Sequence, residues 1–318
     1  MLFRSELERG TAQLIAEGLP GQPVVFTSFG DNRYGAGGTF DTNGILPDSR
    51  TAGDWGGIFL NMGSKASIDN AYIGFGGGQT PIEGGYSTFD VIEVHQGDLR
   101  LANSRIENNA ATTATTDRTG RGTNAPATIF VRGAQPIIVG NDFRDNAGAV
   151  VSINTNSLIE RVIADPGRST GTISRYSQYD ANYGPLVRNN RLTYASGLGA
   201  TVGMVVRAEE ITTETVWDDT DIVHVLTSEI VVQNFNAATG IRLQSDANAS
   251  LVVKLLGANA GITAAGYALE IDDRIGGTVH IVGAPGYPVV MTSLTDDTVG
   301  ASIDASGFPV TEIGRAHV

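Results

Sequence analysis

Carboxylates and amides gather in one loop near the start of the chain. Asp31, Asp41 and Asn43 lie within the stretch GDNRYGAGGTFDTNG, where Asp41 and Asn43 stand at alternate positions. Side-chain oxygens in this pattern can point at a hard cation, so the loop predicts a Ca²⁺ site at Asp31, Asp41 and Asn43. The full EF-hand loop is absent, because no glutamate stands at its twelfth position. Simple turn capping by Asp and Asn is the alternative interpretation.

A second candidate for chemistry is the pair Glu93 and His95 in VIEVHQ. Alternation about Val94 places both side chains on one outward face of a strand. Sugar hydrolysis needs two carboxylates about 5 to 10 Å apart, and a lyase needs a basic residue beside carboxylates that bind a cation. One acid and one histidine on such a face are usually only solvated. Beyond these two weak candidates the sequence identifies no catalytic residue, and no cofactor is expected to be required.

A third cluster lies in WDDTDIVHVL, where Asp218, Asp219 and Asp221 stand beside His224 and could hold a metal. However, His224 interrupts an apolar strand pattern, in which a buried histidine is the commoner case. Trp217 is expected to be a packing anchor at a junction between modules. The chain has no Gly-rich phosphate loop and no Ser-His-Asp order.

Composition excludes several classes of partner and site. The net charge is −13 and only two lysines are present, so a phosphate backbone is an unfavourable partner and no nucleic acid is expected. Because the chain has no cysteine, disulfides and zinc-thiolate sites are excluded. No stretch approaches the roughly 18 apolar residues of a membrane span, so membrane insertion is not expected.

The chain contains an internal copy of its own opening. GQPVVFTSFGDNRYGAG at residues 21–37 returns as GYPVVMTSLTDDTVGAS at residues 286–302, a shift of 265 positions (286 minus 21). Self-similarity at a fixed shift is typical of repeat architectures. The chain is therefore expected to hold one long module and the start of a second.

A shorter phrase recurs within the first module. Its versions are IDNAYI at 68–73, LANSRI at 101–106, IVGNDFR at 138–144 and VRNNRL at 187–192. Alignment places Asn70, Asn103, Gly140 and Asn189 in a turn column, since Asn and Gly tolerate the left-handed backbone that such turns use. A second column, three residues later, is expected to stack inside the fold; it contains Ile73, Ile106, Phe143 and Leu192.

Short β-branched runs separated by Gly, Asn, Asp and Ser predict an all-β chain with many short strands. Unequal spacing of the phrase favours stacked coils with insertions over the constant blades of a propeller. The insertions at 76–90, 111–125 and 155–183 are expected to lie on one side, and stacked asparagines to pass amide hydrogen bonds between coils.

The order PVVFTS, GDWGGIFL and SIDNAYIGFGGG resembles the opening coils of right-handed parallel β-helix repeat proteins, large secreted or surface proteins of environmental bacteria. The resemblance implies a pectin lyase type of fold, with right-handed coils as parallel crossovers favour. It also implies an extracellular or cell-surface location and a non-catalytic, structural or adhesive role toward polysaccharide or other cell-surface components. The alternative is a polysaccharide lyase or glycoside hydrolase of the pectate-lyase-like type.

The expected organisation has three parts. Residues 1–206 form a β-helix module whose start is truncated, and residues 207–311 form a junction and the opening coils of a second module, which is the first module's neighbour. Glu312–Val318, EIGRAHV, resembles a translated sequencing adapter and is expected to be an artefactual tail outside the fold.

Overall fold

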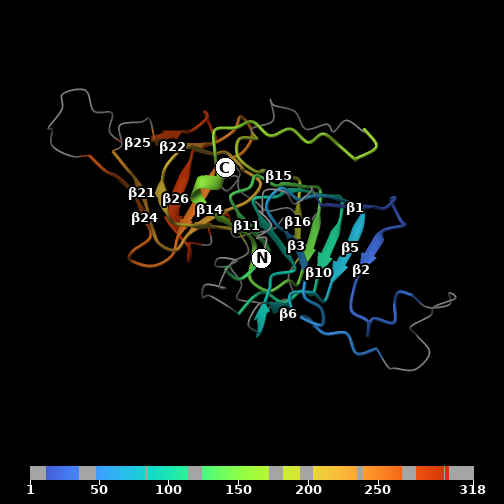
Figure 1. Cartoon of the computed structure of the whole chain (residues 1–318). Helices are drawn as coiled ribbons and strands as arrows, with labels where there is room; N and C mark the ends of the chain where they lie inside the picture. The colour runs from blue at the N-terminus through green and yellow to red at the C-terminus, as the bar shows by residue number, and fades with distance from the viewer. Residues whose placement is uncertain are drawn as a thin grey trace, which may run out of the picture.

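The computed structural model describes residues 12–35, 48–82, 85–113, 124–171, 182–193, 203–234, 239–266, 277–296 and 298–300. Within these ranges the chain is all-β, with long parallel sheets that are consistent with a β-solenoid (Figure 1). The one helical element among them is a single 3-10 turn, η2 (Thr155–Ser157). The predicted tail at 312–318 lies outside the described residues, so its artefactual origin stays a prediction.

Strands far apart in the sequence pair in parallel to form three main sheets. The first sheet contains β1 (Gln13–Glu17), β4 (Lys65–Asp69), β9 (Asp98–Ala102), β12 (Ile137–Val139) and β15 (Leu186–Arg188). The second contains β2 (Val24–Phe26), β5 (Ala71–Gly74), β10 (Arg105–Glu107), β13 (Asp142–Arg144) and β16 (Arg191–Thr193). The long sheet contains β3 (Ile58–Leu60), β8 (Ile92–His95), β11 (Ala127–Arg132), β14 (Ala149–Asn154), β17 (Met204–Arg207), β20 (His224–Leu226), β23 (Val252–Leu255) and β26 (Val290–Ser293).

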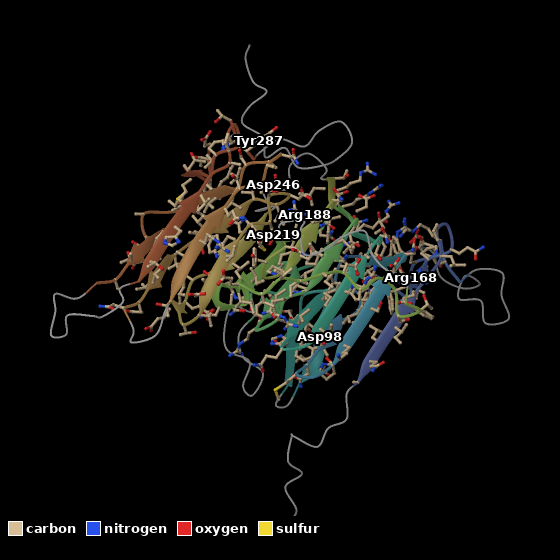
Figure 2. All side chains as sticks on the ribbon, turned by 90° about the horizontal axis from the view of Figure 1, so that it is seen from above. Asp98, Arg168, Arg188, Asp219, Asp246 and Tyr287 are labelled. Atoms are coloured by element: carbon tan, nitrogen blue, oxygen red, sulfur yellow. The ribbon has the colours of Figure 1, made fainter. Side chains whose placement is uncertain are left out.

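The chain visits these sheets in a fixed order. β4, β5 and β8 come in this order along the chain, with a separate two-stranded hairpin between β5 and β8, and they add one strand to the first, second and long sheets in turn. We call such a set of three strands a coil. Seen from above, the strands lie side by side from the N-terminal end to the C-terminal end (Figure 2).

The predicted inward column is confirmed. Ile73 pairs in register with Ile106, Ile106 with Phe143, and Phe143 with Leu192. Each of these four side chains is buried in the main hydrophobic core. A shift of one residue would turn the whole column outward, so burial of these large side chains fixes the register of the coils.

The turn column is also confirmed, but the amide ladder lies one residue further on. Asn70, Asn103, Gly140 and Asn189 all have positive φ, between 48° and 65°. The stacked amides belong to the next column, where Asn141 Nδ2 donates to Asn190 Oδ1 over 3.0 Å. A left-handed residue turns its side chain out of the coil, and the residue after it points toward the next coil.

A second amide ladder was not expected from the sequence. Asn109 Nδ2 donates to Asn146 Oδ1 over 2.8 Å, and Asn109 Oδ1 accepts from the backbone amide of Gly76 over 2.8 Å. Asn109 and Asn146 are both buried. The Asn141–Asn190 ladder satisfies backbone groups at the corner between the first and second sheets, and the Asn109–Asn146 ladder does so at the corner between the second and long sheets.

The first and second sheets end after β15 and β16, close to the predicted boundary at residue 206. Two three-stranded sheets follow. One contains β18 (Glu210–Ile211), β21 (Glu229–Val232) and β24 (Gly261–Ala264). The other contains β19 (Glu214–Trp217), β22 (Gly240–Gln244) and β25 (Thr278–Val282). The long sheet continues across the boundary, because β17 pairs with β20. The division into modules stays a prediction.

Side chains replace a strand at the open edge of β15. Asp219 Oδ1 accepts from the backbone amide of Val187 over 3.0 Å, and Asp221 Oδ2 accepts from that of Asn189 over 2.9 Å. Between them, Arg188 lies 3.5 Å from an oxygen of Asp246 (Figure 2). These carboxylates satisfy the edge that another strand would otherwise pair with, which explains why the first sheet stops here.

The three predicted insertions do not share one side. Residues 76–90 and residues 111–125 both connect the second sheet to the long sheet. The first of these insertions contains the antiparallel hairpin of β6 (Gln79–Ile82) and β7 (Gly85–Thr88). Residues 155–183 instead connect the long sheet to the first sheet. The third insertion therefore leaves from a different corner.

Among the described residues, no helix has the length and apolarity needed to cross a membrane.

Candidate binding groove

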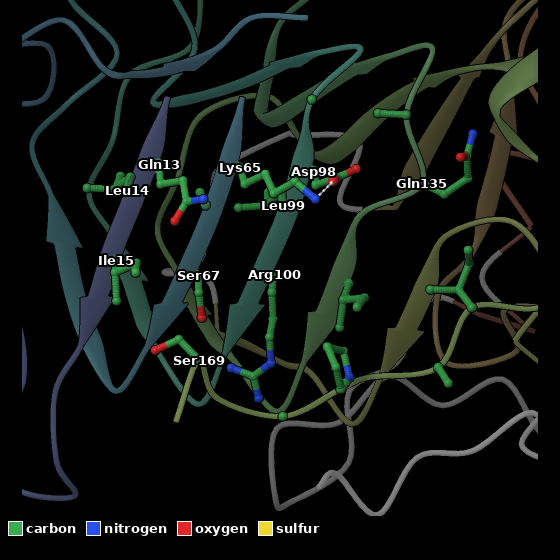
Figure 3. Close-up of a pocket in the computed structure, with 18 of the residues that line it drawn as sticks. Gln13, Leu14, Ile15, Lys65, Ser67, Asp98, Leu99, Arg100, Gln135 and Ser169 are labelled. Carbon is green, nitrogen blue, oxygen red and sulfur yellow. Dashed lines mark ion pairs between the residues drawn. The ribbon is translucent and has the colours of Figure 1, made fainter. Parts of the chain in front are cut away.

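A groove of about 720 Å³ lies on the outer side of the first sheet (Figure 3). Strands β1, β4, β9 and β12 form its floor, and the start of the third insertion, residues 161–171, forms one wall. We call residues 161–171 the crossing segment. Its position turns the outer side of a flat sheet into a concave surface.

Backbone pairing starts the crossing segment in this direction. Val162 makes an antiparallel bridge with Tyr183, and the amide of Ile163 donates to the carbonyl of Asn182 over 2.9 Å. Gly184 adopts a φ of +67° and donates its amide to the carbonyl of Arg161 over 3.0 Å. The chain therefore leaves the long sheet, returns on itself and enters β15, with the crossing segment lying over the first sheet.

Arg100, on β9, fixes the middle of the crossing segment. Its Nε donates to Asp165 Oδ1 over 2.7 Å and its second amino group to Asp165 Oδ2 over 3.2 Å. Its remaining amino group donates to Asp69 Oδ2 on β4 over 2.6 Å. Burial alone would lower the pKa of Arg100, but its hydrogen bonds to Asp165 and Asp69 raise it overall. A buried guanidinium between two carboxylates is stable only while both partners stay in place.

Glu17, at the end of β1, holds the far end of the crossing segment. Its carboxylate accepts from the backbone amide and the hydroxyl of Ser169, each over 2.7 Å, and from the hydroxyl of Ser67. Burial would raise the pKa of Glu17, but these hydrogen bonds lower it overall. Arg168 adds two hydrogen bonds to the backbone carbonyls of Gly18 and Glu17, over 2.7 and 3.0 Å.

The open part of the groove is lined by polar and apolar side chains. Ile15 and Val162 are 57% and 38% exposed, and their apolar surfaces face the solvent at the groove. Gln13 and Gln135 supply amide groups nearby. Lys65 Nζ and Asp98 Oδ2 form an exposed ion pair over 3.2 Å on the floor. The groove thus offers hydrogen-bond donors and acceptors across a floor of four strands, which suits a polyhydroxylated ligand.

Glu93 and His95 lie on the same side of β8, as predicted, but they are buried and not solvated. His95 Nε2 lies 3.0 Å from Glu93 Oε2, and Asn124 Nδ2 donates to Glu93 Oε1 over 3.0 Å. The imidazole stacks on the ring of Phe59, 4.7 Å between centroids. Asn124, at the end of the second insertion, closes over this side of the long sheet. The pair is thus enclosed and lies apart from the residues that line the groove.

The calcium prediction is only partly within the described residues. Asp31 is buried, and its carboxylate accepts from Arg33 Nε over 2.9 Å and from Thr27 Oγ1 over 2.6 Å. Asp41 and Asn43 lie outside the described residues. In this position the Asp31 carboxylate is hydrogen-bonded to the guanidinium of Arg33, whose positive charge repels a cation. The calcium site stays a prediction, tested by whether millimolar Ca²⁺ raises the melting temperature.

The cluster around Asp218 lies at a sheet edge. Asp218 Oδ2 accepts from the backbone amide of Tyr183 over 3.2 Å, so it caps the same stretch as Asp219 and Asp221. Trp217 is fully buried, which confirms it as a packing anchor, and its ring stacks on His224 at 5.3 Å. Burial lowers the pKa of His224 to about 3. Across the described ranges, no group of three or more His, Asp or Glu is placed to hold a metal ion.

Sequence reasoning missed the residues that build the groove. Arg100 and Asp165 are 65 positions apart, and Glu17 and Ser169 are 152 apart. The only available signal was the outward position of an arginine in the apolar strand DLRLA.

Comparisons of the chain with protein-family models, with curated proteins and with solved structures each return no match.

Proposed function

We propose that the chain is a segment of a right-handed parallel β-helix that binds a glycan in the groove beneath the crossing segment. In this proposal it belongs to a secreted or cell-surface bacterial protein and acts as a rigid, adhesive spacer between neighbouring modules. The observation that carries the proposal is the groove of about 720 Å³ on the outer side of β1, β4, β9 and β12.

The arrangement of charge favours binding over catalysis. Arg100 and Arg168 hold the crossing segment in place, and Lys65 and Asp98 neutralise each other. These four charged groups are thus engaged with protein partners and not aimed at one bond of a ligand; Arg161 is the remaining charged residue among those that line the groove. The alternative, a polysaccharide lyase or hydrolase, has no specific observation in its favour.

A binding panel tests this proposal. The full chain is titrated with neutral, acidic and amino-sugar polysaccharides, and each mixture is then assayed for new reducing ends or unsaturated sugars. We expect binding of at least one class, without turnover. Val162→Arg, which adds bulk and charge at an exposed position of the wall, should weaken that binding. Tyr86→Arg, at a 72% exposed position on β7, is the matched control.

Absence of binding across the panel, or binding that Val162→Arg and Tyr86→Arg affect equally, would contradict the groove as the site. Release of sugar products would favour the enzyme alternative.

A further inference from the structure

The internal sequence copy is also a copy of local structure. β25 (Thr278–Val282) corresponds to β1 (Gln13–Glu17) at the same shift of 265 positions (278 minus 13). The turn after each strand closes with an antiparallel bridge, Leu19 with Gln22 and Ala284 with Tyr287.

The loop that follows is reproduced as well. Thr27 Oγ1 donates to Asp31 Oδ2 over 2.6 Å, and Thr292 Oγ1 donates to Asp296 Oδ2 over 2.6 Å. Because the second copy has Thr298 where the first has Arg33, this loop conformation does not depend on the arginine.

The two copies are paired on opposite edges. β1 and β2 pair with the strands that follow them, β4 and β5, and no described strand pairs with their other edge. β25 and β26 pair with the strands that precede them, β22 and β23, and their far edge has no partner within the described ranges. The first copy therefore shows which strands, β4 and β5, fit against the open edge of the second copy.

The open edge of the second copy exposes side chains that point inward. Ile281 is 56% exposed and Met291 is 40% exposed. In the first copy the corresponding Ala16 is 4% exposed, because the β4–β5 coil covers it. An apolar strand edge with unpaired backbone groups is a template for another strand.

We propose that the β25–β26 edge is a docking surface for the β4–β5 coil of a second copy of this chain. In the docked pair, β25 and β26 replace the second copy's own β1 and β2, in the register that places His280 opposite Ser67. The exchange keeps the number of strand pairings: it covers the open edge of β25 and β26 and releases the second copy's β1 and β2 from β4 and β5. Such a head-to-tail contact does not close on itself and so leads to linear multimers. Docking follows from strand pairing and does not require glycan binding, but the exchange takes β1 out of the floor of the groove.

One side chain distinguishes the two copies at this interface. The carboxylate of Glu17 accepts hydrogen bonds from Ser67 and Ser169. The corresponding residue of the second copy is Val282, which is 47% exposed and cannot accept such hydrogen bonds through its side chain. The first copy therefore holds the β4–β5 coil more tightly than the second. Glu17 favours the closed, unexchanged chain, and a glutamate at 282 removes this preference.

Engineered cysteines test the contact directly, because the chain has no cysteine of its own. Adjacent strands lie about 4.8 Å apart, within the Cα separation that a disulfide spans. In the full chain, Ser67→Cys with His280→Cys should give a ladder of covalent multimers on oxidation. Ser67→Cys with Ile281→Cys is the matched control, since residue 281 points to the other side of the strand. Ile15→Cys with Ser67→Cys should close within one chain and reports that the fold is intact.

A second variant tests the same interface without a covalent bond. Val282→Glu should strengthen self-association about tenfold in sedimentation velocity, the size expected for hydrogen bonds to a charged group. Val282→Gln, which has nearly the same shape and no charge, should have a smaller effect. Equal multimer yields from the His280 and Ile281 pairs, together with no gain from Val282→Glu, would overturn the proposal.

Discussion

The guanidinium of Arg100 and the carboxylate of Asp165 join β9 to a segment that crosses the outside of the same sheet, through two hydrogen bonds of 2.7 and 3.2 Å. This contact turns a regular stack of strands into a surface with a groove. It is buried, charged and far from local in sequence, so its loss has effects that can be measured.

Arg100→Met is expected to destabilise the chain by about 3 kcal/mol, because it leaves two buried carboxylates without their shared partner. Hydrogen exchange should also become faster across the crossing segment. Lys65→Met is the matched control, since its pair with Asp98 is exposed, and it should change the free energy of unfolding by less than about 1 kcal/mol. Urea unfolding measures both variants. Equal effects would show that Arg100 does not anchor the crossing segment.

Phe143→Ala is expected to cost about 3 to 5 kcal/mol, because the ring is fully buried between Ile106 and Leu192. Tyr86→Ala, at an exposed position, should be nearly neutral. Thermal unfolding compares the two. A small effect at Phe143 would mean that the inward column does not support the coils.

The two kinds of asparagine should respond differently to substitution. Asn103→Gly should cost only about 1 kcal/mol, because glycine occupies this positive-φ position in the next coil, at Gly140, and the change removes a single side-chain hydrogen bond, from Asn103 Nδ2 to Asp69 Oδ1. Asn141→Ala should cost about 2 kcal/mol or more, because it removes the acceptor for the amide of Ser104 and the donor to the carbonyl of Leu101. The reverse order of stabilities would contradict the ladder.

The aspartates at the edge of β15 should make stability fall as pH rises. Burial raises the pKa of Asp218 to about 7 and that of Asp219 well above its usual range. In the unfolded chain both titrate near 4. Between about pH 4 and 7 the folded chain holds more protons, so the free energy of unfolding decreases with pH, by about 1.4 kcal/mol per unit for each proton.

Asp219→Asn should flatten this slope and stabilise the chain at pH 8. Asp296→Asn is the control, because hydrogen bonds from Thr292 and Thr298 lower the pKa of Asp296 to about 2 and its titration falls below this window. Urea titrations at pH 5 and 8 give both values. A slope that Asp219→Asn leaves unchanged would rule out these carboxyls as its source.

Local pattern was enough to predict the coils. Ile73, Ile106, Phe143 and Leu192 could be aligned because inward positions recur with the same neighbours, and the turn column followed from the tolerance of Asn and Gly for positive φ. The amide ladder was displaced by one residue, since the sequence does not show which of two adjacent asparagines points out of the coil.

The groove could not be predicted in the same way. It depends on where an insertion lies after it leaves the coil, and that is decided by pairs such as Arg100 with Asp165. The same reason accounts for Glu93 and His95: their alternation was visible, but the cover that buries them comes from Asn124, 31 positions away. Long-range contacts of single side chains leave no periodic signal.

Hydrogen exchange with and without the tightest-binding polysaccharide of the panel tests the central claim most directly. The account predicts slower exchange in the crossing segment, residues 161–171, and in β4 and β9 beneath it, with the far strands β20 and β23 unchanged. Binding that protects another face of the sheets, or that leaves residues 161–171 unprotected, would contradict the groove as the place where this chain meets its ligand.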